Sequence, residues 1–474
     1  VGYQLIKHMM DDGYYTNLGA FPAVPMKNTG VRFTITRLHT FSQIEGMVSS
    51  MAHHFDKVLE EQNFSREQIY KAFRIDSPKE KMEKELLHSQ LASSQLNVEH
   101  YASIKDIDPV VWNSLFEGRG SFDYDGLVFL ESAFKNNPEP ENNWEFDYLI
   151  VREKANNSIV LATFFTTTLC KDDMLAHEAV SEKIEHIRQT DDKYFLTSKM
   201  VMTGSLLTEG NHVYVREISN FKKQAFQELF HTVSQLQKNY NASSIMLRDF
   251  HDGQPAMDKL MLENGFFKVQ MPDTNIHSQM IWKTEDQYLS ILSKKERYHV
   301  RSEILRHADH FEVDIIKAPT DAQVANWIHL YKDVKEGSYK LNTFDLPERL
   351  FKEIATYPNW EAQSIKLKRE DGTLEEVAVV FNYKSGTTYN AMFIGINKHI
   401  ETPFSIYRQA LYQILKRANE LNCITVNFGF TASLEKRRLG AAAFKTVAYM
   451  QSEDHFNASV IESMQVIKNQ FIAT

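Results

Sequence analysis

The stretch from Gly395 to Ser405 combines residue types that prepare the start of a helix for an anion. Thr402 is a suitable N-cap, Pro403 fits the first helical position, and Ser405 follows within the first turn. The first N–H groups of a helix have no partner inside it, and a strand carrying Gly395 leads into this one. The sequence therefore predicts an anion site here, against the alternative that most capped helices bind nothing.

The helix expected from Phe404 to Leu421 has an apolar face. Its apolar residues recur at helical spacing, at Ile406, Ala410, Leu411, Ile414, Leu415, Ala418 and Leu421. The face predicts that one side packs on a sheet while the first turn stays open to a ligand.

Basic residues elsewhere leave two interpretations open. Lys436, Arg437 and Arg438 suit a phosphate or an acidic acceptor, but also a solvated face. Lys222 and Lys223 lie in the first turn of a helix expected from about residue 220, where cations oppose the helix dipole unless a bound phosphate offsets them. Four more cations line either an entry channel or a solvated helix face: Lys294, Lys295, Arg297 and Arg301.

Composition describes the protein that must position these residues. The chain has 474 residues, 43% of them hydrophobic and 24% charged, which predicts about three globular units. A net charge of -9 argues against nucleic acid as a partner.

The two cysteines, Cys170 and Cys423, lie far apart in apolar runs and predict buried thiols in a reducing compartment. No stretch approaches the roughly 20 apolar residues of a membrane span, and no signal peptide is visible, so we expect a cytoplasmic protein.

Two later stretches share one order of elements, which predicts an α+β or α/β fold with two mixed sheets flanked by helices. The first has strands at 98–103, 146–153, 159–170, 244–250 and 267–270, with helices at 109–116, 124–134, 221–240 and 255–264. The second has strands at 311–316, 361–369, 376–384, 388–396, 424–430 and 445–451, with helices at 321–335, 347–356, 404–421 and 433–439. We expect units at 97–282 and 283–474, after a charged helical linker at 65–96.

These two units resemble tandem acyltransferases of the GNAT superfamily, in its FemAB-like or peptidoglycan-biosynthesis-like branch. The motifs are 293–301 (SKKERYHVR), 393–397 (FIGIN), 426–430 (VNFGF), 435–440 (EKRRLG) and 262–269 (LENGFFKV). The glycine-rich pyrophosphate loop of ordinary acetyltransferases is not evident. The resemblance implies acyl-CoA, or an acyl carrier protein, as donor and a small amine as acceptor.

On that resemblance we assign roles in the second unit. The donor would be held by Ile394, Gly395, Ile396, Thr402, Ser405, Lys436 and Arg437. Amine acylation needs a proton acceptor, a donor for the thioester oxygen and an acid for the leaving thiolate. A backbone N–H within 393–396 would serve the oxygen, Tyr407 or Tyr389 would be the acid, and Asn427 would orient the amine. Each of these side chains could instead satisfy only local hydrogen bonds. The histidines form no metal-ligand spacing.

Residues 1–64 form a small α/β piece that resembles the C-terminus of the α-oxoamine synthases, typified by 8-amino-7-oxononanoate synthase, which are fold-type I pyridoxal-phosphate enzymes. The match lies in 13–25 (GYYTNLGAFPAVP), 30–36 (GVRFTIT) and 38–40 (LHT). It implies that Arg32 binds an amino-acid carboxylate. The Schiff-base lysine of that family would precede Val1, so pyridoxal phosphate is expected only with an upstream domain, and the chain begins like a truncated or processed one.

The expected activity is therefore N-acyl transfer, in amino-lipid or cell-envelope metabolism. One alternative is a part of an α-oxoamine synthase with accessory GNAT-like domains. Another is a non-catalytic GNAT-like scaffold for dimerisation or protein binding. A homodimer is compatible with the resemblance to oxoamine synthases, which are typically dimers.

Overall fold

A computed structural model describes residues 1–19, 30–36, 39–73, 95–336, 338–339, 341–400 and 402–452. The chain divides into two compact units, Val1–Gln95 and Leu96–Thr474. The predicted linker at 65–96 is therefore described at its two ends only, and Leu38 and much of the 13–25 motif lie outside the described residues.

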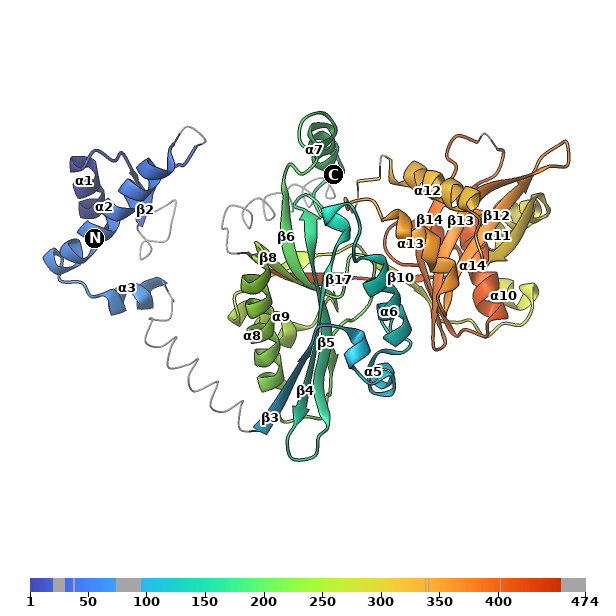
Figure 1. The fold of residues 1–474 in the computed structure, drawn as a ribbon, viewed down its shortest axis with the longest axis horizontal. Helices are drawn as coiled ribbons and strands as arrows, with labels where there is room; N and C mark the ends of the chain where they lie inside the picture. The colour runs from blue at the N-terminus through green and yellow to red at the C-terminus, as the bar shows by residue number, and fades with distance from the viewer. Residues whose placement is uncertain are drawn as a thin grey trace. The chain divides into compact units, whose positions relative to one another are not determined.

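The first unit pairs two helices beside a short hairpin (Figure 1). Its elements are α1 (Gly2–Asp11), β1 (Asn17–Gly19), β2 (Gly30–Arg32), α2 (Phe41–Glu61) and α3 (Arg66–Phe73). Thr40 and Gln43 form a capping box at the start of α2. The described part of residues 1–64 thus contains both helices and strands.

The second unit contains two mixed sheets. The first sheet has the order β3-β4-β5-β6-β8-β17-β9, with β7 beside β5. Its strands are β3 (Leu96–Tyr101), β4 (Glu145–Glu153), β5 (Ile159–Lys171), β6 (Thr197–Thr203), β7 (Tyr214–Val215), β8 (Ser244–His251), β9 (Phe267–Gln270) and β17 (Thr446–Ser452). Among the described residues, β6 and β8 are the one parallel pair of this sheet.

The second sheet has the order β11-β12-β13-β14-β15-β10-β16. Its strands are β10 (Thr274–His277), β11 (Phe311–Ile316), β12 (Trp360–Lys368), β13 (Leu374–Ser385), β14 (Thr388–Ile396), β15 (Thr425–Asn427) and β16 (Ala442–Phe444). Its one parallel pair among the described residues is β14 with β15. The predicted fold class of two mixed sheets flanked by helices is confirmed.

Helices cover both faces of each sheet. The longest, α8 (Lys222–Tyr240) and α14 (Ile406–Glu420), cross between the parallel strands of the first and second sheet. The others are α5 (Pro109–Phe116), α6 (Tyr124–Ala133), α7 (Glu178–Thr190), α9 (Pro255–Glu263), α10 (Glu285–Ile291), α11 (Lys294–Glu303), α12 (Asp321–Lys335), α13 (Glu348–Glu353) and α15 (Ser433–Arg438).

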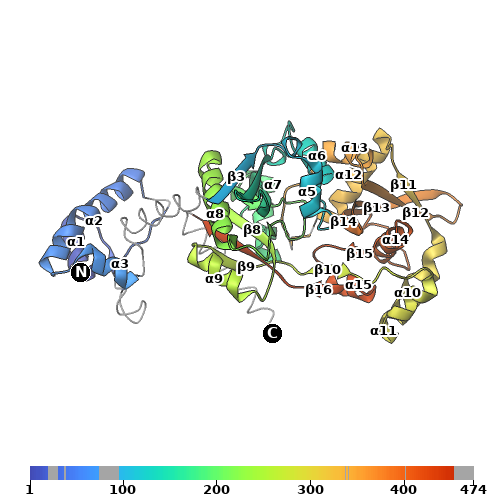
Figure 2. The same ribbon diagram turned by 90° about the horizontal axis from the view of Figure 1, so that it is seen from below.

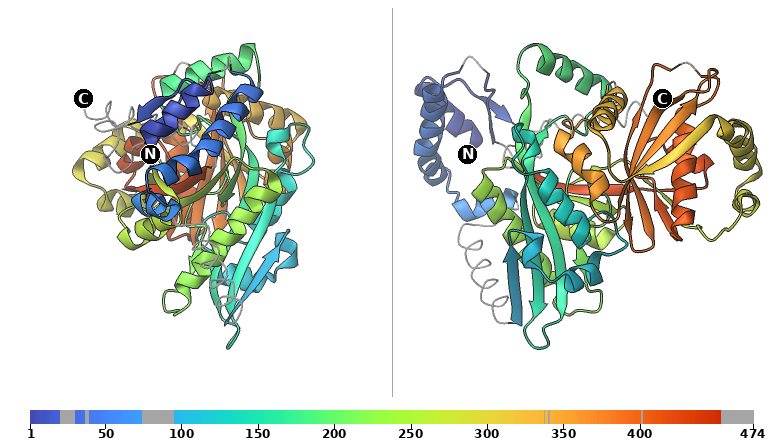
Figure 3. Two further views of the ribbon diagram at one scale, coloured as in Figure 1. Left: turned by 90° about the vertical axis from the view of Figure 1, so that its left-hand side faces the viewer. Right: turned by 45° about the vertical axis from the view of Figure 1, so that its right-hand side comes forward.

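One hydrophobic core joins the two sheets. Side chains of α5 and α6 pack with those of α12 and α13 in the same buried cluster, which includes Trp112, Phe129, Trp327 and Trp360. These helices lie between the sheets, while α8 and α14 cover the outer faces (Figures 1 and 3). The two halves therefore form one compact unit, in which a residue of either half can reach a site on the other.

The halves also exchange strands (Figure 2). The segment after β9 crosses to the second sheet, where β10 lies between β15 and β16. In return, the chain passes from β16 to β17, which lies between β8 and β9 of the first sheet. The sequence plan placed the strand at 445–451 in the second unit, and this is corrected: it completes the first sheet. A boundary between 282 and 283 would therefore separate β10 from the second sheet, to which it belongs, and β17 from the first sheet.

Candidate functional site

The second sheet opens where its parallel strands diverge. β14 and β15 pair over three positions, ending with Asn390 opposite Asn427. β14 then continues to Ile396 with β13 as its partner. We call this opening the second fork. Beyond Asn390, the edge of β14 that faces β15 has no strand partner, so its backbone N–H and C=O groups can bind a ligand.

A cavity of about 230 Å³ occupies the second fork. Its walls are the 391–394 segment of β14, Tyr407 and Leu411 of α14, the C-terminal end of α12, and the loop Phe428–Thr431 that follows β15. β14 bulges here, because Phe381 pairs with Phe393 and Asn382 with Ala391, which leaves Met392 over. The extra residue bends β14 locally where its 391–394 segment forms the cavity wall.

Two opposite charges meet in this cavity. Glu209 comes from the loop after β6 in the first half, and its Oε1 accepts a hydrogen bond from the Phe430 N–H at 3.3 Å. Lys436 of α15 is 4% exposed, and its Nζ donates to the carbonyl oxygens of Phe428, Gly429 and Phe430 at 2.6, 3.1 and 2.6 Å. Lys436 thus holds the loop that contacts Glu209.

Gly429 permits this close approach. Its φ is +70°, and a Cβ at this position would lie 3.0 Å from both carboxylate oxygens of Glu209. A side chain here would therefore displace the carboxylate from the cavity wall.

Burial changes the acidity of both charged groups. Desolvation, with Asp249 nearby, raises the pKa of Glu209, while Lys436 and Arg248 oppose the rise only in part. Desolvation likewise lowers the pKa of Lys436, against the attraction of Glu209. A carboxyl whose pKa is raised toward neutrality is suited to accept a proton from a substrate and to release it afterwards.

A third charged side chain, Lys335, lies at the end of α12 on the cavity wall. Its Nζ donates to Thr343 Oγ1 at 2.7 Å, and desolvation lowers the pKa of Lys335 to about 8. The cavity therefore carries one acid and two amines whose charges are all disfavoured by burial.

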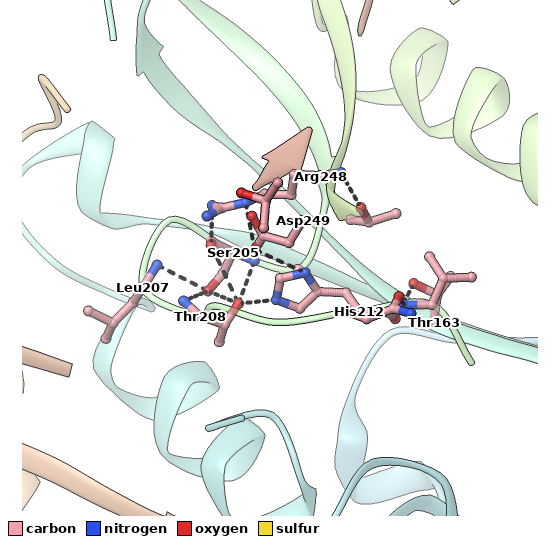
Figure 4. A network of polar contacts seen from close by, with 12 residues as sticks. Thr163, Ser205, Leu207, Thr208, His212, Arg248 and Asp249 are labelled. Atoms are coloured by element: carbon pink, nitrogen blue, oxygen red, sulfur yellow. Dashed lines mark hydrogen bonds and ion pairs between the residues drawn. The ribbon is translucent and has the colours of Figure 1, made fainter. Parts of the chain in front are cut away.

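The corresponding opening in the first sheet is occupied by the protein itself. β6 and β8 pair in parallel up to Met202 and Met246, and beyond this first fork Arg248 Nη1 donates to the Ser205 carbonyl at 2.7 Å (Figure 4). Arg248 Nε lies 3.3 Å from Asp249 Oδ2. These residues of the first fork are buried.

A histidine completes the network of the first fork (Figure 4). His212 is fully buried, its Nε2 is 2.9 Å from Thr208 Oγ1, and its Nδ1 is 3.6 Å from Asp249 Oδ2. Burial, with Arg248 close by, lowers the pKa of His212, so the ring is neutral near pH 7. The first fork is a packed polar core.

Three residues predicted from the sequence line the second-fork cavity. Ile394, Tyr407 and Lys436 lie there together. Burial, with Glu435 adding to it, raises the pKa of Tyr407 to about 12. Asn427 lines a small neighbouring cavity, where its Oδ1 accepts the Gly429 N–H at 2.9 Å.

Other predicted residues have structural partners. Tyr389 is fully buried and donates to Glu361 Oε2 at 2.9 Å, away from the residues that line the cavity. Gly395 allows α12 to pack closely on β14, because a Cβ at this position would lie 2.8 Å from Leu330 Cβ and from the Tyr331 nitrogen. Ile396 ends β14 and packs against the core cluster that contains Tyr389. Arg437 is exposed, and its Nε donates to the Ser433 carbonyl at 3.3 Å.

The predicted N-cap of this helix is corrected by three residues, from Thr402 to Ser405. α14 begins at Ile406 with Ser405 as its N-cap, whose Oγ accepts the Arg408 N–H at 3.3 Å. Thr402, the expected cap, instead donates its hydroxyl to the Phe404 carbonyl. Pro403 therefore precedes the helix, because the serine hydroxyl three residues before Arg408 satisfies the first turn.

Two further basic candidates form ion pairs, and one lies in the first unit. Lys222 starts α8 and pairs with Glu217 at 2.7 Å, and Arg438 pairs with Glu435 at 2.5 Å. Arg32 ends β2 with an exposed side chain, in register with Asn17. Its role as a carboxylate clamp, and the relation of the first unit to α-oxoamine synthases, stay predictions.

Sequence reasoning missed Glu209 and Lys335. Glu209 lies 179 residues before the start of β14, whose cavity it enters, and no motif marks it. Lys335 looked like an ordinary cation in the last turn of a helix. Neither position carries a signal that a single sequence could have disclosed.

No protein-family model matches the chain, and no curated protein matches it. Several solved structures are similar. One is FemX, with 13% identity and a TM-score of 0.48 over 77% of this chain and 100% of that one. Another is L-PGS from Bacillus licheniformis, with 10% identity and a TM-score of 0.42 over 76% and 97%. A third is a tandem GNAT protein from the clavulanic acid biosynthesis pathway, with 11% identity and a TM-score of 0.43 over 75% and 98%.

Two features are absent from the described residues, a membrane-spanning helix and a metal-binding cluster. None of their helices is long and apolar enough to cross a membrane. Within the same ranges, no three His, Cys, Asp or Glu side chains gather as a metal site would require.

Proposed function

We propose that this protein transfers an acyl group from a thioester to an amine in the second-fork cavity. The observation that carries the proposal is the meeting of Glu209 with the uncovered edge of β14 in one cavity. Such a site offers a base for the amine and backbone donors for the carbonyl oxygen, which are the main requirements of acyl transfer.

The proposed chemistry uses the protein's own side chains. Glu209 accepts a proton from the ammonium form of the acceptor, and the freed nitrogen attacks the acyl carbon. The carbonyl oxygen gains charge, which backbone N–H groups of the bulged 391–394 segment stabilise. The carbon–sulfur bond then breaks and the thiolate takes a proton from Tyr407. The nitrogen of the adduct loses its second proton, which returns through solvent to the Tyr407 oxygen, so that the products are an amide, a free thiol and the proton on Glu209.

The choice of Tyr407 over Tyr389 follows from their contacts. Tyr389 already donates its only hydroxyl hydrogen to Glu361 at 2.9 Å, within the hydrophobic core. Tyr407 lines the cavity and lies in the first turn of α14. Because a thiolate is a weaker base than a phenolate, Tyr407 first stabilises the leaving sulfur by a hydrogen bond, and the proton transfer is completed only as the Tyr407 oxygen regains the proton lost by the adduct nitrogen.

For the donor, we propose acyl-CoA or an acyl carrier protein. Apolar side chains of the cavity, including Leu341, Leu411 and Phe430, suit the acyl chain. Residues 402–405 before α14 are the proposed contact for the phosphates, with Arg437 as an exposed cation nearby on the following helix.

The decisive experiment compares Glu209→Gln with the unchanged protein in an assay that follows thiol release from long-chain acyl-CoA with a primary amine as acceptor. We expect kcat/KM to fall about 10²- to 10⁴-fold, because the amide cannot accept the proton. Glu217→Gln is the matched control, since Glu217 is exposed and pairs with Lys222. Equal rates in all three proteins would exclude Glu209 as the base, and no thiol release in any of them would refute the proposed function.

A further inference from the structure

Beside the larger cavity lies a second one of about 10 Å³, which we call the polar pocket. It is lined by Ser121, Leu207, Glu209, Asn390, Ala391, Met392 and Asn427. Three of these residues also line the larger cavity: Glu209, Ala391 and Met392. A molecule in the larger cavity can therefore extend one small group toward the polar pocket.

Three buried oxygen atoms of the polar pocket lack a partner within the described part of the chain: Ser121 Oγ, Asn390 Oδ1 and Glu209 Oε2. Ser121 and Asn390 are 1% and 3% exposed. A buried polar atom without a hydrogen bond costs about 1–3 kcal/mol, so three of them in one pocket point to a missing ligand.

The existing hydrogen bonds decide what the ligand must offer. Asn390 Nδ2 donates to the Tyr383 carbonyl at 3.2 Å, so the amide oxygen is the atom left open. Glu209 Oε1 accepts the Phe430 N–H, so Oε2 is open. A hydroxyl oxygen such as Ser121 Oγ can also accept. Three acceptors with one negative charge are complementary to a group with three N–H donors and a positive charge.

From this arrangement we infer that Ser121, Asn390 and Glu209 bind the primary ammonium group of the acceptor. A pocket of about 10 Å³ admits one group of the size of water or –NH₃⁺, so a quaternary ammonium is excluded by size. The inference deepens the proposed function and rests on it, since it names primary amines as the acceptor class. Ser121 acts as a positioning residue that places the nitrogen beside its base.

Thermal unfolding in the presence of small amines tests the inference. We expect butylammonium chloride to raise Tm with saturation, because its chain occupies the larger cavity while its ammonium fills the polar pocket. Tetramethylammonium chloride at the same concentrations and 1-butanol should leave Tm unchanged. Ser121→Ala should raise the half-saturating butylammonium concentration about tenfold, because a hydrogen bond to a charged group is lost.

Thr167→Val is the matched control. Thr167 carries an equally buried hydroxyl without a partner in the described residues, on β5 and outside both cavities. We expect this variant to bind butylammonium like the unchanged protein. Equal stabilisation by tetramethylammonium, or an unchanged half-saturating concentration in Ser121→Ala, would overturn the inference and assign a bound water to the pocket.

The two proposals fail in different ways. If thiol release depends on Glu209 but Ser121→Ala leaves KM for the amine unchanged and N-methylbutylamine reacts as well as butylamine, the inference fails and the proposed function stands. If butylammonium binds as expected but no thiol is released, the ammonium site stands and the proposed function fails.

Discussion

The first and second forks are built alike and filled differently. In both, two parallel strands separate beyond a short paired segment, and a long helix connects them. The first fork is closed by Arg248, Asp249 and His212, all buried. The second keeps a cavity of about 230 Å³. In the first half, buried polar side chains fill the opening between the parallel strands. In the second half, the same opening remains large enough for a ligand.

The two forks nevertheless share one electrostatic environment. Asp249 of the first fork raises the pKa of Glu209, which lies in the second, and Arg248 opposes it. The closed fork thus helps to set the acidity of the open one. A comparison of variants in both halves can show how far each depends on the other.

The largest expected effect comes from ending the chain at Lys445, which removes β17 from the first sheet. Val447, Ala448, Tyr449 and Met450 are at most 2% exposed, and burial of a large apolar side chain contributes about 1.5–3 kcal/mol. Since a domain has a stability of only about 5–15 kcal/mol, we expect both halves to lose cooperative unfolding, followed by circular dichroism. A chain ended at Ser452 is the control, and a second half that still unfolded cooperatively without β17 would show that the halves fold independently.

A second variant, Arg248→Met, empties the closed fork of its cation. It leaves Asp249 buried without its partner, and such a loss costs about 3–5 kcal/mol, which a denaturant titration would detect. Arg437→Met, at an exposed arginine, should change stability by no more than about 0.5 kcal/mol. If both variants lowered the free energy of unfolding by the same small amount, Asp249 would be protonated in the folded protein.

The third prediction concerns the pH dependence of stability in Glu209→Gln. The pKa of Glu209 is raised in the folded state, so folding takes up a proton at this carboxyl. The contribution of Glu209 to the free energy of unfolding therefore falls as the pH rises above its pKa in the unfolded chain, which is about 4.3. Asp249, Lys436 and Arg248 are the charged groups that face it. Between pH 5 and 7 we expect the unchanged protein to lose about 1–2 kcal/mol relative to the variant, measured by urea unfolding. Parallel pH profiles would show that Glu209 is ionised as in water.

The smallest expected effect is at the start of α14. Ser405→Ala removes the side-chain cap and should cost about 1 kcal/mol, measured by thermal unfolding. α8, the equivalent helix of the first half, has Phe221 as N-cap and no side-chain cap hydrogen bond. Lys223→Ala, at an exposed position in the first turn of that helix, is therefore expected to cost less, and a reversed order would argue against the role of Ser405 as a cap.

Much of the fold could be predicted because its signals are local. β14 and α12 occur at the predicted residues, 388–396 and 321–335, since alternation and helical periodicity describe each element by itself. The start of α14 was misplaced because Thr402 and Ser405 are both competent caps, and sequence alone does not decide between them. β10 and β16 escaped notice because strands of three or four residues carry too little pattern.

The sequence by itself determined two α/β halves, their order of elements and three of the cavity residues, Ile394, Tyr407 and Lys436. Only the tertiary structure decided that β17 joins the first sheet and that Glu209 and Ser121 of the first half meet Asn390 of the second. The physical reason is that periodicity reports which face of an element is apolar, whereas strand pairing and buried charge depend on contacts between residues up to about 270 positions apart.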